Sequence, residues 1–433
     1  MTDFANYRGI EFQTRAEIRS VQEELLRGHL RFCATRSPYY RRMFEEKGLD
    51  PEKTTLERLE DIPLTGKTAL ECDNDAFLAV GREEIVDIVF SSGTTGRPTK
   101  IAYTDHDLER LAYNEHQSLY GAGVGSDDSV LLTCTMDRCF VAGLAYFLGT
   151  RSIGAAAVRN GRATLESHME VIRRISPTVI IGVPSFLLKL AEHMQSSGMA
   201  PSGSSVKKLI CIGEPVRDHE MKPLPAGAAL KRMWNASICS TYASSETVST
   251  FCECEQENGG HLHPELAVVE VLAENGETVP PGEPGEVVIT PLGVEGMPLV
   301  RFRTGDISFL LEEPCGCGRN STRLGPILAR KKQMIKLKGT TIYPRAISTA
   351  LDEIPAVAEH YLEVESAGDL SDSVTVNVSI SDPAWNADRL RRHLQSRLRV
   401  KPEVAVRPLE EIRSEVFSPH YRKPMRFFDR REQ

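Results

Sequence analysis

The sequence lacks a long apolar run, and this lack argues against a membrane-spanning helix. No stretch of the 433 residues approaches the roughly 20 consecutive apolar residues that a membrane-spanning helix needs. The N-terminus MTDFANYRGI carries an early acidic side chain and no apolar segment of the kind found in secretory signals. We therefore expect a cytoplasmic protein that does not act in a membrane.

An excess of positive charge is also missing. The chain has 52 Lys and Arg against 60 Asp and Glu, which gives a net charge of −8. This balance argues against a general nucleic-acid-binding surface. The length favours two or three domains over one core. We find no internal repeat and no low-complexity segment.

A Walker A loop is absent, although two segments match part of one. That loop requires G-x-x-x-x-G-K-[ST]. The segment LTGKTALE has the right ending at residues 66–68, but Asp61 stands where the first glycine must be. In SSGTTGRPTK, residues 91–100, the two glycines are three apart and the lysine comes four residues after the second. Neither segment is a Walker A loop.

The segment SSGTTGRPTK nevertheless has the composition of a phosphate-binding loop. Glycine loosens the backbone, and Ser and Thr compete for its hydrogen bonds, so a loop is expected. The preceding apolar residues predict a buried strand: Ile85, Val86, Ile88, Val89 and Phe90. Exposed N–H groups and hydroxyls can surround phosphate oxygens, with Lys or Arg adding charge. The composition predicts a nucleotide triphosphate site, and a solvated turn is the alternative.

This segment resembles the phosphate loop of the adenylate-forming superfamily, the acyl-CoA synthetases and their relatives. A second motif follows in family order: STYASSET resembles Tyr-Gly-x-Thr-Glu, with Tyr242, Ser245 and Glu246 at corresponding positions and Ala243 in place of the usual Gly. An aromatic ring can stack on adenine, and a carboxylate can hold Mg²⁺. The resemblance implies that Glu246 is a catalytic Mg²⁺ ligand; alone, the segment also fits a turn with a surface Glu.

Two further motifs resemble the family's ribose site and its interdomain segment. RFRTGDISFL resembles Arg-Thr-Gly-Asp, which implies that Asp306 accepts hydrogen bonds from both ribose hydroxyls. LARKKQMIKLKGTTIYP resembles the segment that joins the two domains. There Arg330 would contact the ribose, Lys332 would be the hinge, and Gly339 would lie where the thiol arm enters. An ordinary strand turn remains the alternative for Asp306.

The tail SPHYRKPMRFFDRR places Lys423 where the family carries the lysine that helps to activate the carboxylate. An ammonium group there can stabilise the negative charge that develops between carboxylate and α-phosphate. Arg422 departs from the usual Gly, and a solvated lysine is the alternative.

The likeness is closest to the phenylacetate-CoA ligase group and covers about residues 39–430, with IGVPSFLLKLAEHM and LICIGEPV among its markers. It implies an AMP-forming ligase that activates an aryl or related, phenylacetate-like acid with ATP and Mg²⁺ and passes the acyl group to coenzyme A. The alternatives are an enzyme that loads a carrier-protein thiol and a non-catalytic nucleotide-binding module. A homodimer is one option. The nucleotide- and CoA-facing residues implied are Ser91, Ser92, Gly93, Thr94, Thr95, Gly96, Lys100, Gly213, Glu214, Pro215, Tyr242, Ala243, Ser244, Ser245, Asp306, Arg330, Lys332 and Gly339.

The same resemblance implies that the acid binds near MDRCFVAGLAYFLG and near CIGEP. Phe140 and Tyr146 suit an aryl group, together with their neighbours Cys139, Val141 and Ala142. The alternative is that they are ordinary core residues, which aromatic side chains more often are.

Cysteine and histidine gather at two places, CECEQENGGHLH and PCGCGR. Ten Cys in a chain expected in the cytoplasm favour reduced thiols over disulfides. Tetrahedral Zn²⁺ takes four Cys or His ligands, and six candidates are present. Likeness to metal-binding members of the group favours Cys254 and His261, and Cys315 and Cys317 complete the set; Cys252 and His263 are substitutes. We predict a structural Zn²⁺ because four protein ligands leave no place for substrate, and chance clustering is the alternative.

The order of elements predicts the fold class. RAEIRSVQEELLRGHLRFCA has the spacing of an amphipathic helix. Apolar runs such as TVIIGV and KLICIG alternate with helical segments, which indicates layered α/β structure with mostly parallel sheets and a smaller antiparallel part. We predict a large α/β N-terminal domain over residues 1–329. A small, mobile α+β lid over residues 330–433 would follow, with the hinge near residues 330–332.

Overall fold

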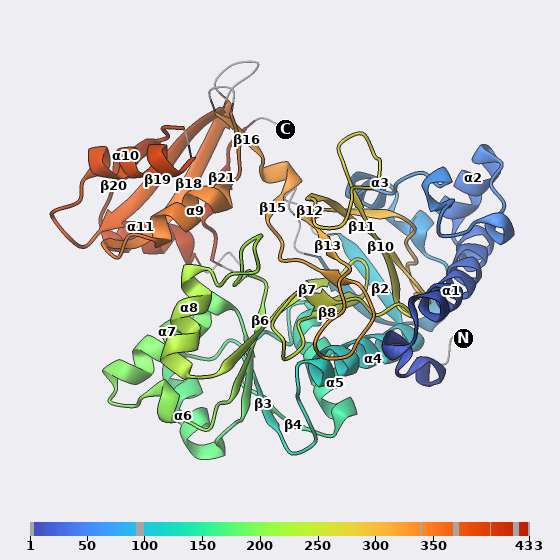
Figure 1. Ribbon diagram of the computed structural model, residues 1–433, viewed down its shortest axis with the longest axis horizontal. Helices are drawn as coiled ribbons and strands as arrows, with labels where there is room; N and C mark the ends of the chain where they lie inside the picture. Colours follow the sequence, from blue (N-terminus) through green and yellow to red (C-terminus); the bar gives the residue numbers. More distant parts are fainter. Residues whose placement is uncertain are drawn as a thin grey trace. The chain divides into compact units, whose positions relative to one another are not determined.

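A computed structural model describes residues 4–91, 99–337, 340–366, 372–398, 400–418 and 424–431. The chain divides into two compact units (Figure 1). The first comprises Met1–Thr304 and Ser308–Ile327, and the second comprises Gly305–Ile307 and Leu328–Gln433.

The first unit begins with helices that cover part of its core. The predicted amphipathic helix is α1 (Arg15–Arg36), and α2 (Pro38–Lys47) and α3 (Lys67–Cys72) follow. Thr14 and Glu17 form a capping box that fixes the start of α1. Leu26, Leu30 and Tyr40 are fully buried in a core shared with residues of the antiparallel strands.

A six-stranded sheet forms the centre of this unit, with the order β4-β3-β5-β6-β7-β8. Neighbouring strands from β4 to β7 are parallel, and β8 runs antiparallel to β7. The strands are β3 (Ser129–Leu132), β4 (Ala156–Arg159), β5 (Val179–Gly182), β6 (Lys208–Ile212), β7 (Ser237–Ser244) and β8 (Ser249–Cys252).

Helices cover both faces of this sheet because alternate strand residues point to opposite sides. On one face α6 (Leu165–Ile175), α7 (Pro184–Ser196) and α8 (Pro225–Trp234) pack against side chains such as Leu131 and Leu209. On the other, α4 (Asp105–Gly121) and α5 (Val141–Ile153) pack against Val130 and Ile210. The carboxyl ends of β3, β5, β6 and β7 therefore share one edge, where ligands of open α/β sheets bind.

Antiparallel strands complete the first unit and lead into the second. The hairpin of β1 (Ile85–Phe90) and β2 (Lys100–Thr104) forms its own sheet. A four-stranded sheet has the order β10-β11-β12-β15, and a three-stranded sheet has the order β13-β14-β9. These strands are β9 (Gly260–His261), β10 (Ala267–Leu272), β11 (Gly285–Pro291), β12 (Phe302–Ser308), β13 (Leu310–Leu311), β14 (Arg323–Leu324) and β15 (Ala329–Arg330).

The second unit has a core of its own, including Leu362, Val376 and Leu390. Its four-stranded sheet has the order β20-β19-β18-β21, in which the central pair is antiparallel and the outer pairs are parallel. The elements are β16 (Ile335–Leu337), β17 (Thr340–Ile342), α9 (Pro344–Asp352), β18 (Val357–Ser366), β19 (Asp372–Ile380), α10 (Ala387–Leu398), β20 (Glu403–Val406), α11 (Leu409–Val416) and β21 (Phe427–Asp429). The predicted fold class, a large α/β part followed by a small α+β part, is confirmed.

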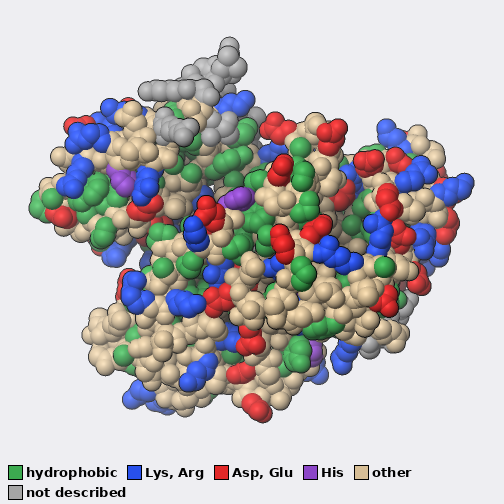
Figure 2. Space-filling view, in the orientation of Figure 1, with side chains coloured by type: hydrophobic (Ala, Val, Ile, Leu, Met, Phe, Trp, Pro, Cys, Tyr) green, Lys and Arg blue, Asp and Glu red, His purple; other side chains and the backbone are tan. Residues whose placement is uncertain are grey.

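The helices in the described part of the chain include none that is both long and apolar enough to cross a membrane. Figure 2 shows acidic and basic side chains interspersed over the visible face.

One buried carboxyl group gives the first unit a pH-dependent stability. Glu115 on α4 is 1% exposed, and Thr250 Oγ1 donates a 2.5 Å hydrogen bond to it. Burial raises the pKa of Glu115 to about 7 from 4.5. Between these values the native chain retains a proton that the unfolded chain has released, so the free energy of unfolding falls as pH rises through this window.

Replacing Glu115 with Gln should remove this contribution. Between pH 5 and pH 8, the free energy of unfolding of the native protein should fall by roughly 2–3 kcal/mol more than that of Glu115→Gln, because a shift of one pKa unit corresponds to about 1.4 kcal/mol. Denaturant unfolding of both proteins at the two pH values measures the difference. Equal changes with pH in the two proteins would contradict the assignment.

Candidate active site

The turn between β7 and β8 carries the predicted Mg²⁺ ligand. Tyr242 lies near the end of β7, pairs with Phe251 of β8 and stacks on its ring at 6.3 Å between centroids. Tyr103 donates a 2.9 Å hydrogen bond to the Ser245 carbonyl, and the buried Arg110 donates to the Val248 carbonyl. Two buried side chains thus hold the backbone of this turn in place.

Glu246 projects from this turn and is held by two donors. Lys67 Nζ lies 3.2 Å from its Oε1, and Ser244 Oγ donates to its Oε2 at 3.2 Å. The side chains of Lys67 and Glu246 are 16% and 14% exposed. Ala243 occupies the position of the usual Gly within regular β7, where the β7–β8 pairing continues through it.

The base of the predicted phosphate loop lies beside this carboxylate. Ser91 is buried, its N–H donates to the Thr99 carbonyl at 3.0 Å, and Lys67 Nζ reaches its hydroxyl at 3.4 Å. Lys100 starts β2 and pairs with Asp75 at 2.5 Å. Ser92, Gly93, Thr94, Thr95 and Gly96, predicted to contact phosphates, lie outside the described residues.

The loop after β3 reaches the same region. The Phe90 N–H, at the end of β1, donates to the Cys139 carbonyl at 2.8 Å. Arg138 and Cys139 have φ of 59° and 53°, a left-handed conformation that non-glycine residues seldom adopt and that clusters at functional sites. The predicted acid-binding loop is therefore hydrogen-bonded to the residue just before the predicted phosphate loop.

The predicted acid-pocket residues take different places. Cys139 and Phe140 line a groove of about 390 Å³ together with Val86, Asp87 and Met136. Tyr146, in contrast, is 2% exposed in the core between α5 and the sheet. For Tyr146 the alternative of an ordinary core aromatic holds.

The segment Gly213-Glu214-Pro215 follows β6 at the same sheet edge. Gly213 has φ of 73°, which explains a glycine at this position. Glu214 accepts hydrogen bonds from the N–H of Ser185 at 3.0 Å and from its hydroxyl at 2.8 Å. Its carboxylate thus satisfies a donor in the first turn of α7.

The ribose-site candidates pair with each other. Asp306 of β12 is opposite Arg330 of β15, whose Nε donates to Asp306 Oδ1 at 3.0 Å. The Asp306 side chain is 10% exposed and that of Arg330 is 48% exposed. Lys332 lies in a short 3₁₀ turn, and its carbonyl accepts a hydrogen bond from Arg431. Gly339 and Lys423 lie outside the described residues.

The four predicted zinc ligands converge. One ligand atom each from Cys254, His261, Cys315 and Cys317 lies within 4.8 Å of the others. The Sγ atoms of Cys254 and Cys315 are 3.6 Å apart, and Cys317 Sγ is 3.4 Å from His261 Nε2. A tetrahedral Zn²⁺ with ordinary bond lengths places its ligand atoms about 3.3–3.8 Å apart, so the donor set fits the metal.

The substitute ligands lie elsewhere. Cys252 accepts a hydrogen bond from Thr241 within the core. His263 contacts Ser118 at 3.1 Å and lies 3.6 Å from the carboxylate of Glu11. Burial opposes the ionisation of Glu11, but His263 and Arg319 lower its pKa to about 2.

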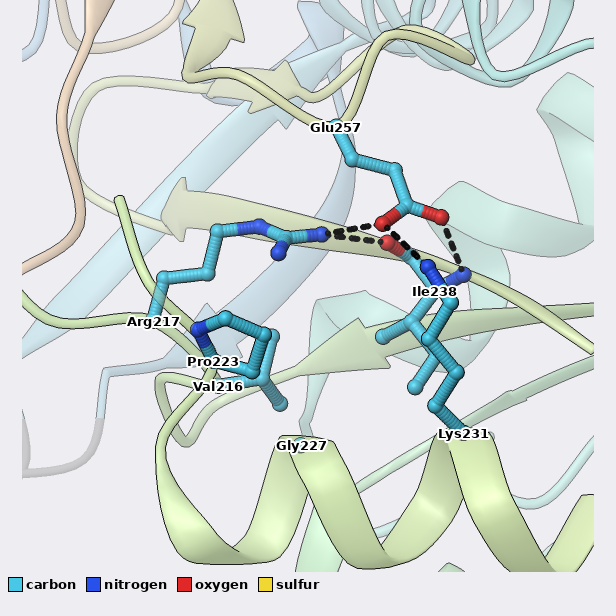
Figure 3. Close-up of a pocket in the computed structure, with 7 residues that line it drawn as sticks. All are labelled: Val216, Arg217, Pro223, Gly227, Lys231, Ile238 and Glu257. Carbon is cyan, nitrogen blue, oxygen red and sulfur yellow. Dashed lines mark hydrogen bonds and ion pairs between the residues drawn. The ribbon is translucent and has the colours of Figure 1, made fainter.

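Ion pairs hold the loop that carries Cys254. Arg217 bonds to Glu253 at 2.9 Å. Arg217 also bonds to Glu257 at 3.0 Å, and Lys231 of α8 reaches Glu257 at 3.2 Å (Figure 3). The hollow beside these side chains has a volume of about 10 Å³, room for a single water molecule. The ion pairs form a structural network, and the hollow beside them is too small to bind a substrate.

Comparison with known proteins identifies the family. A family model described as AMP-binding enzyme matches residues 35–294, and one described as AMP-binding enzyme C-terminal domain matches residues 339–431. A phenylacetate-coenzyme A ligase from Thermus thermophilus is 34% identical over 381 residues, which are 86% of this chain and 84% of that protein. The chain belongs to the AMP-binding enzyme family, in its phenylacetate-CoA ligase group.

Other relatives of this AMP-binding enzyme agree. A phenylacetate-coenzyme A ligase from Escherichia coli K12 is 29% identical and covers 92% of this chain and 91% of its own length. A solved 2-hydroxyisobutyryl-CoA ligase in the postadenylation state aligns with a TM-score of 0.85 at 21% identity, over 96% of this chain and 90% of the other. At that identity the structural match supports the fold alone, and the fold is the one predicted.

Proposed function

We propose that this enzyme activates an aryl acid of the phenylacetate type and transfers the acyl group to coenzyme A. It is an AMP-forming acid–CoA ligase, the activity that its membership of the phenylacetate-CoA ligase group supports. The observation that carries the proposal is the placement of Glu246, held at the carboxyl end of β7 next to the base of the phosphate loop at Ser91.

In the first half-reaction an oxygen of the carboxylate substrate attacks the α-phosphorus of ATP. The bond to the β-phosphate oxygen breaks, and pyrophosphate leaves with its electron pair. The segment 91–100, which ends with Lys100, and Lys423 would offset the negative charge that accumulates, and Glu246 would hold Mg²⁺. When bound, Mg²⁺ would neutralise part of the negative charge of the phosphate groups.

In the second half-reaction the thiol sulfur of coenzyme A attacks the acyl carbon, and AMP leaves. Asp306, paired with Arg330, offers a carboxylate oxygen to the ribose hydroxyls and keeps the nucleotide oriented in both steps. We assign residues 1–329 to the substrate-binding domain and residues 330–433 to a lid. Rotation about Lys332 would exchange Lys423 for the segment around Gly339 between the two steps.

The acid is assigned to the loop after β3, with the side chain of Phe140, which lines the groove there, against the aryl ring. Gly213 and its neighbours border the site from β6. Residues Cys139, Val141 and Ala142 would shape the pocket through the strained turn before α5.

The cluster of Cys254, His261, Cys315 and Cys317 is assigned to a structural Zn²⁺. Ser321 supports the other nitrogen of the His261 ring, with Oγ 3.2 Å from Nδ1, a contact typical of ligating histidines. The ion would connect the segment after β8 with the segment before β14, and so brace the turn that carries Glu246.

The direct test is product analysis across a panel of aryl and aliphatic acids with ATP and Mg²⁺, each with and without coenzyme A. We expect one class of aryl acids to yield AMP, pyrophosphate and, only when coenzyme A is present, the acyl thioester. Pyrophosphate release without use of coenzyme A would favour a carrier-protein acceptor. ATP binding without release for any acid would favour a non-catalytic module.

Loss of the lid lysine should separate the half-reactions. Lys423→Ala is expected to lower the rate of adenylation about 100-fold or more, because the lost cation stabilises only that transition state. ATP binding and thioester formation from a synthetic acyl adenylate should change little. Rapid-quench measurement of each half-reaction checks this, with Lys401→Ala as a matched control; wild-type adenylation by Lys423→Ala would refute the role.

A further inference from the structure

Lys67 contacts the phosphate end of the site but belongs to none of the motifs that define it. It comes from LTGKTALE, the segment that resembles the end of a Walker A loop without its first glycine. Its Nζ lies 3.2 Å from Glu246 Oε1 and 3.4 Å from Ser91 Oγ. One ammonium group thus joins the proposed Mg²⁺ ligand to the first residue of the phosphate loop.

The segment that carries Lys67 is firmly anchored. Thr65 forms a β-bridge with Phe302 at the start of β12. The Thr65 N–H donates to the Arg301 carbonyl at 3.0 Å, and the Arg303 N–H donates to the Thr65 carbonyl at 2.8 Å. The Tyr40 hydroxyl lies 3.1 Å from the Thr65 hydroxyl. Arg301 also donates to the carbonyls of Glu60 and Ile62. Lys67 is therefore fixed in position at the site and is not a mobile surface lysine.

The burial of this ion pair favours a role in binding. At 16% and 14% exposure, both charges are mostly withdrawn from water, which costs free energy that a purely structural contact seldom recovers. With Mg²⁺ and a triphosphate bound, Glu246 would hold the metal. The Lys67 ammonium, 3.4 Å from Ser91 Oγ, could then donate to phosphate oxygens at the loop that begins with Ser91.

On the basis of the function proposed above, we infer that Lys67 binds the β- and γ-phosphates of ATP, the part that leaves as pyrophosphate. In the nucleotide-free chain it holds Glu246 in place, and on binding it exchanges that carboxylate for phosphate oxygens. Lys67 therefore acts in adenylation and not in thioester formation, because the acyl adenylate has no pyrophosphate group.

Direct binding tests this without turnover. Calorimetry with magnesium pyrophosphate should show at least about 10-fold weaker binding by Lys67→Met, while AMP binding stays within about 2-fold. Lys53→Met is the matched control, since Lys53 lies in the same N-terminal region with a side chain 79% exposed. Unchanged pyrophosphate binding by Lys67→Met would overturn the inference, whether or not the native enzyme turns over any acid.

A second pair of variants separates binding from positioning and guards against misfolding. Glu246→Gln removes the negative charge that pairs with Lys67. The double variant Glu246→Gln/Lys67→Met removes both charges, so it leaves no unpaired charge in the site. If Lys67 binds phosphate itself, the double variant should bind magnesium pyrophosphate about 10-fold more weakly than Glu246→Gln. If Lys67 acts only through Glu246, the two should bind equally, which would refute direct contact. In kinetics, Lys67→Met should lower kcat/KM for ATP and leave thioester formation from acyl adenylate within about 2-fold.

Discussion

Glu246→Gln is expected to lower the rate of adenylation about 100- to 1,000-fold, the usual cost of losing a preorganised electrostatic group. Gln keeps the size of the side chain and its hydrogen bond to Ser244 but removes the charge that Mg²⁺ requires. The Mg²⁺ concentration for half-maximal rate should rise strongly. Rapid-quench assays of acyl adenylate over a Mg²⁺ series measure both effects.

The matched control is Glu109→Gln, which makes the same change at an exposed position of α4. It should adenylate at the native rate. Thermal unfolding must show that Glu246→Gln is folded, because the change leaves Lys67 without its carboxylate partner. A folded Glu246→Gln protein with a native rate and native Mg²⁺ dependence would exclude Glu246 as the metal ligand.

The zinc cluster should have the largest effect on stability. Cys315→Ser is expected to lower the free energy of unfolding by roughly 4 kcal/mol, since loss of a bound metal is among the few changes with effects of that size. The native protein should contain one zinc per chain, and the variant much less. Metal content by mass spectrometry and denaturant unfolding measure the two quantities.

Two other cysteines provide the controls. Cys72 is exposed and apart from the cluster, so Cys72→Ser should keep both zinc and stability. Cys252 is buried in the core near the cluster, so Cys252→Ser should lose some stability but keep the metal. If Cys252→Ser lost zinc while Cys315→Ser retained it, the ligand set proposed here would be wrong.

Much of the fold could be predicted because its signals are local. The spacing in residues 15–34 indicated a helix, and α1 spans Arg15–Arg36. The apolar runs around residues 179–182 and 208–212 indicated buried parallel strands, and both are central in the sheet. Strand pairing across the chain, such as β9 with β14, depends on contacts between residues far apart, and no local pattern encodes it.

The candidate site was harder to predict from the sequence, because its residues also lie far apart along the chain. Lys67 precedes Glu246 by 179 residues, so only the fold brings them to 3.2 Å. The GKT ending at Lys67 does not complete a Walker pattern, because Asp61 stands at the position of its first glycine, so the local sequence does not predict a phosphate-binding role for Lys67. The carboxylate of Glu214 bonds to Ser185, which lies 29 residues earlier in the chain and is a partner that the sequence did not suggest.

Acid-dependent exchange of labelled pyrophosphate into ATP, measured without coenzyme A, tests the central claim most directly. The account predicts exchange with at least one aryl acid, strict dependence on that acid and on Mg²⁺, and loss of exchange in Glu246→Gln. Absence of exchange with every acid by a folded, zinc-containing protein that still binds ATP would contradict it, since such a chain forms no acyl adenylate.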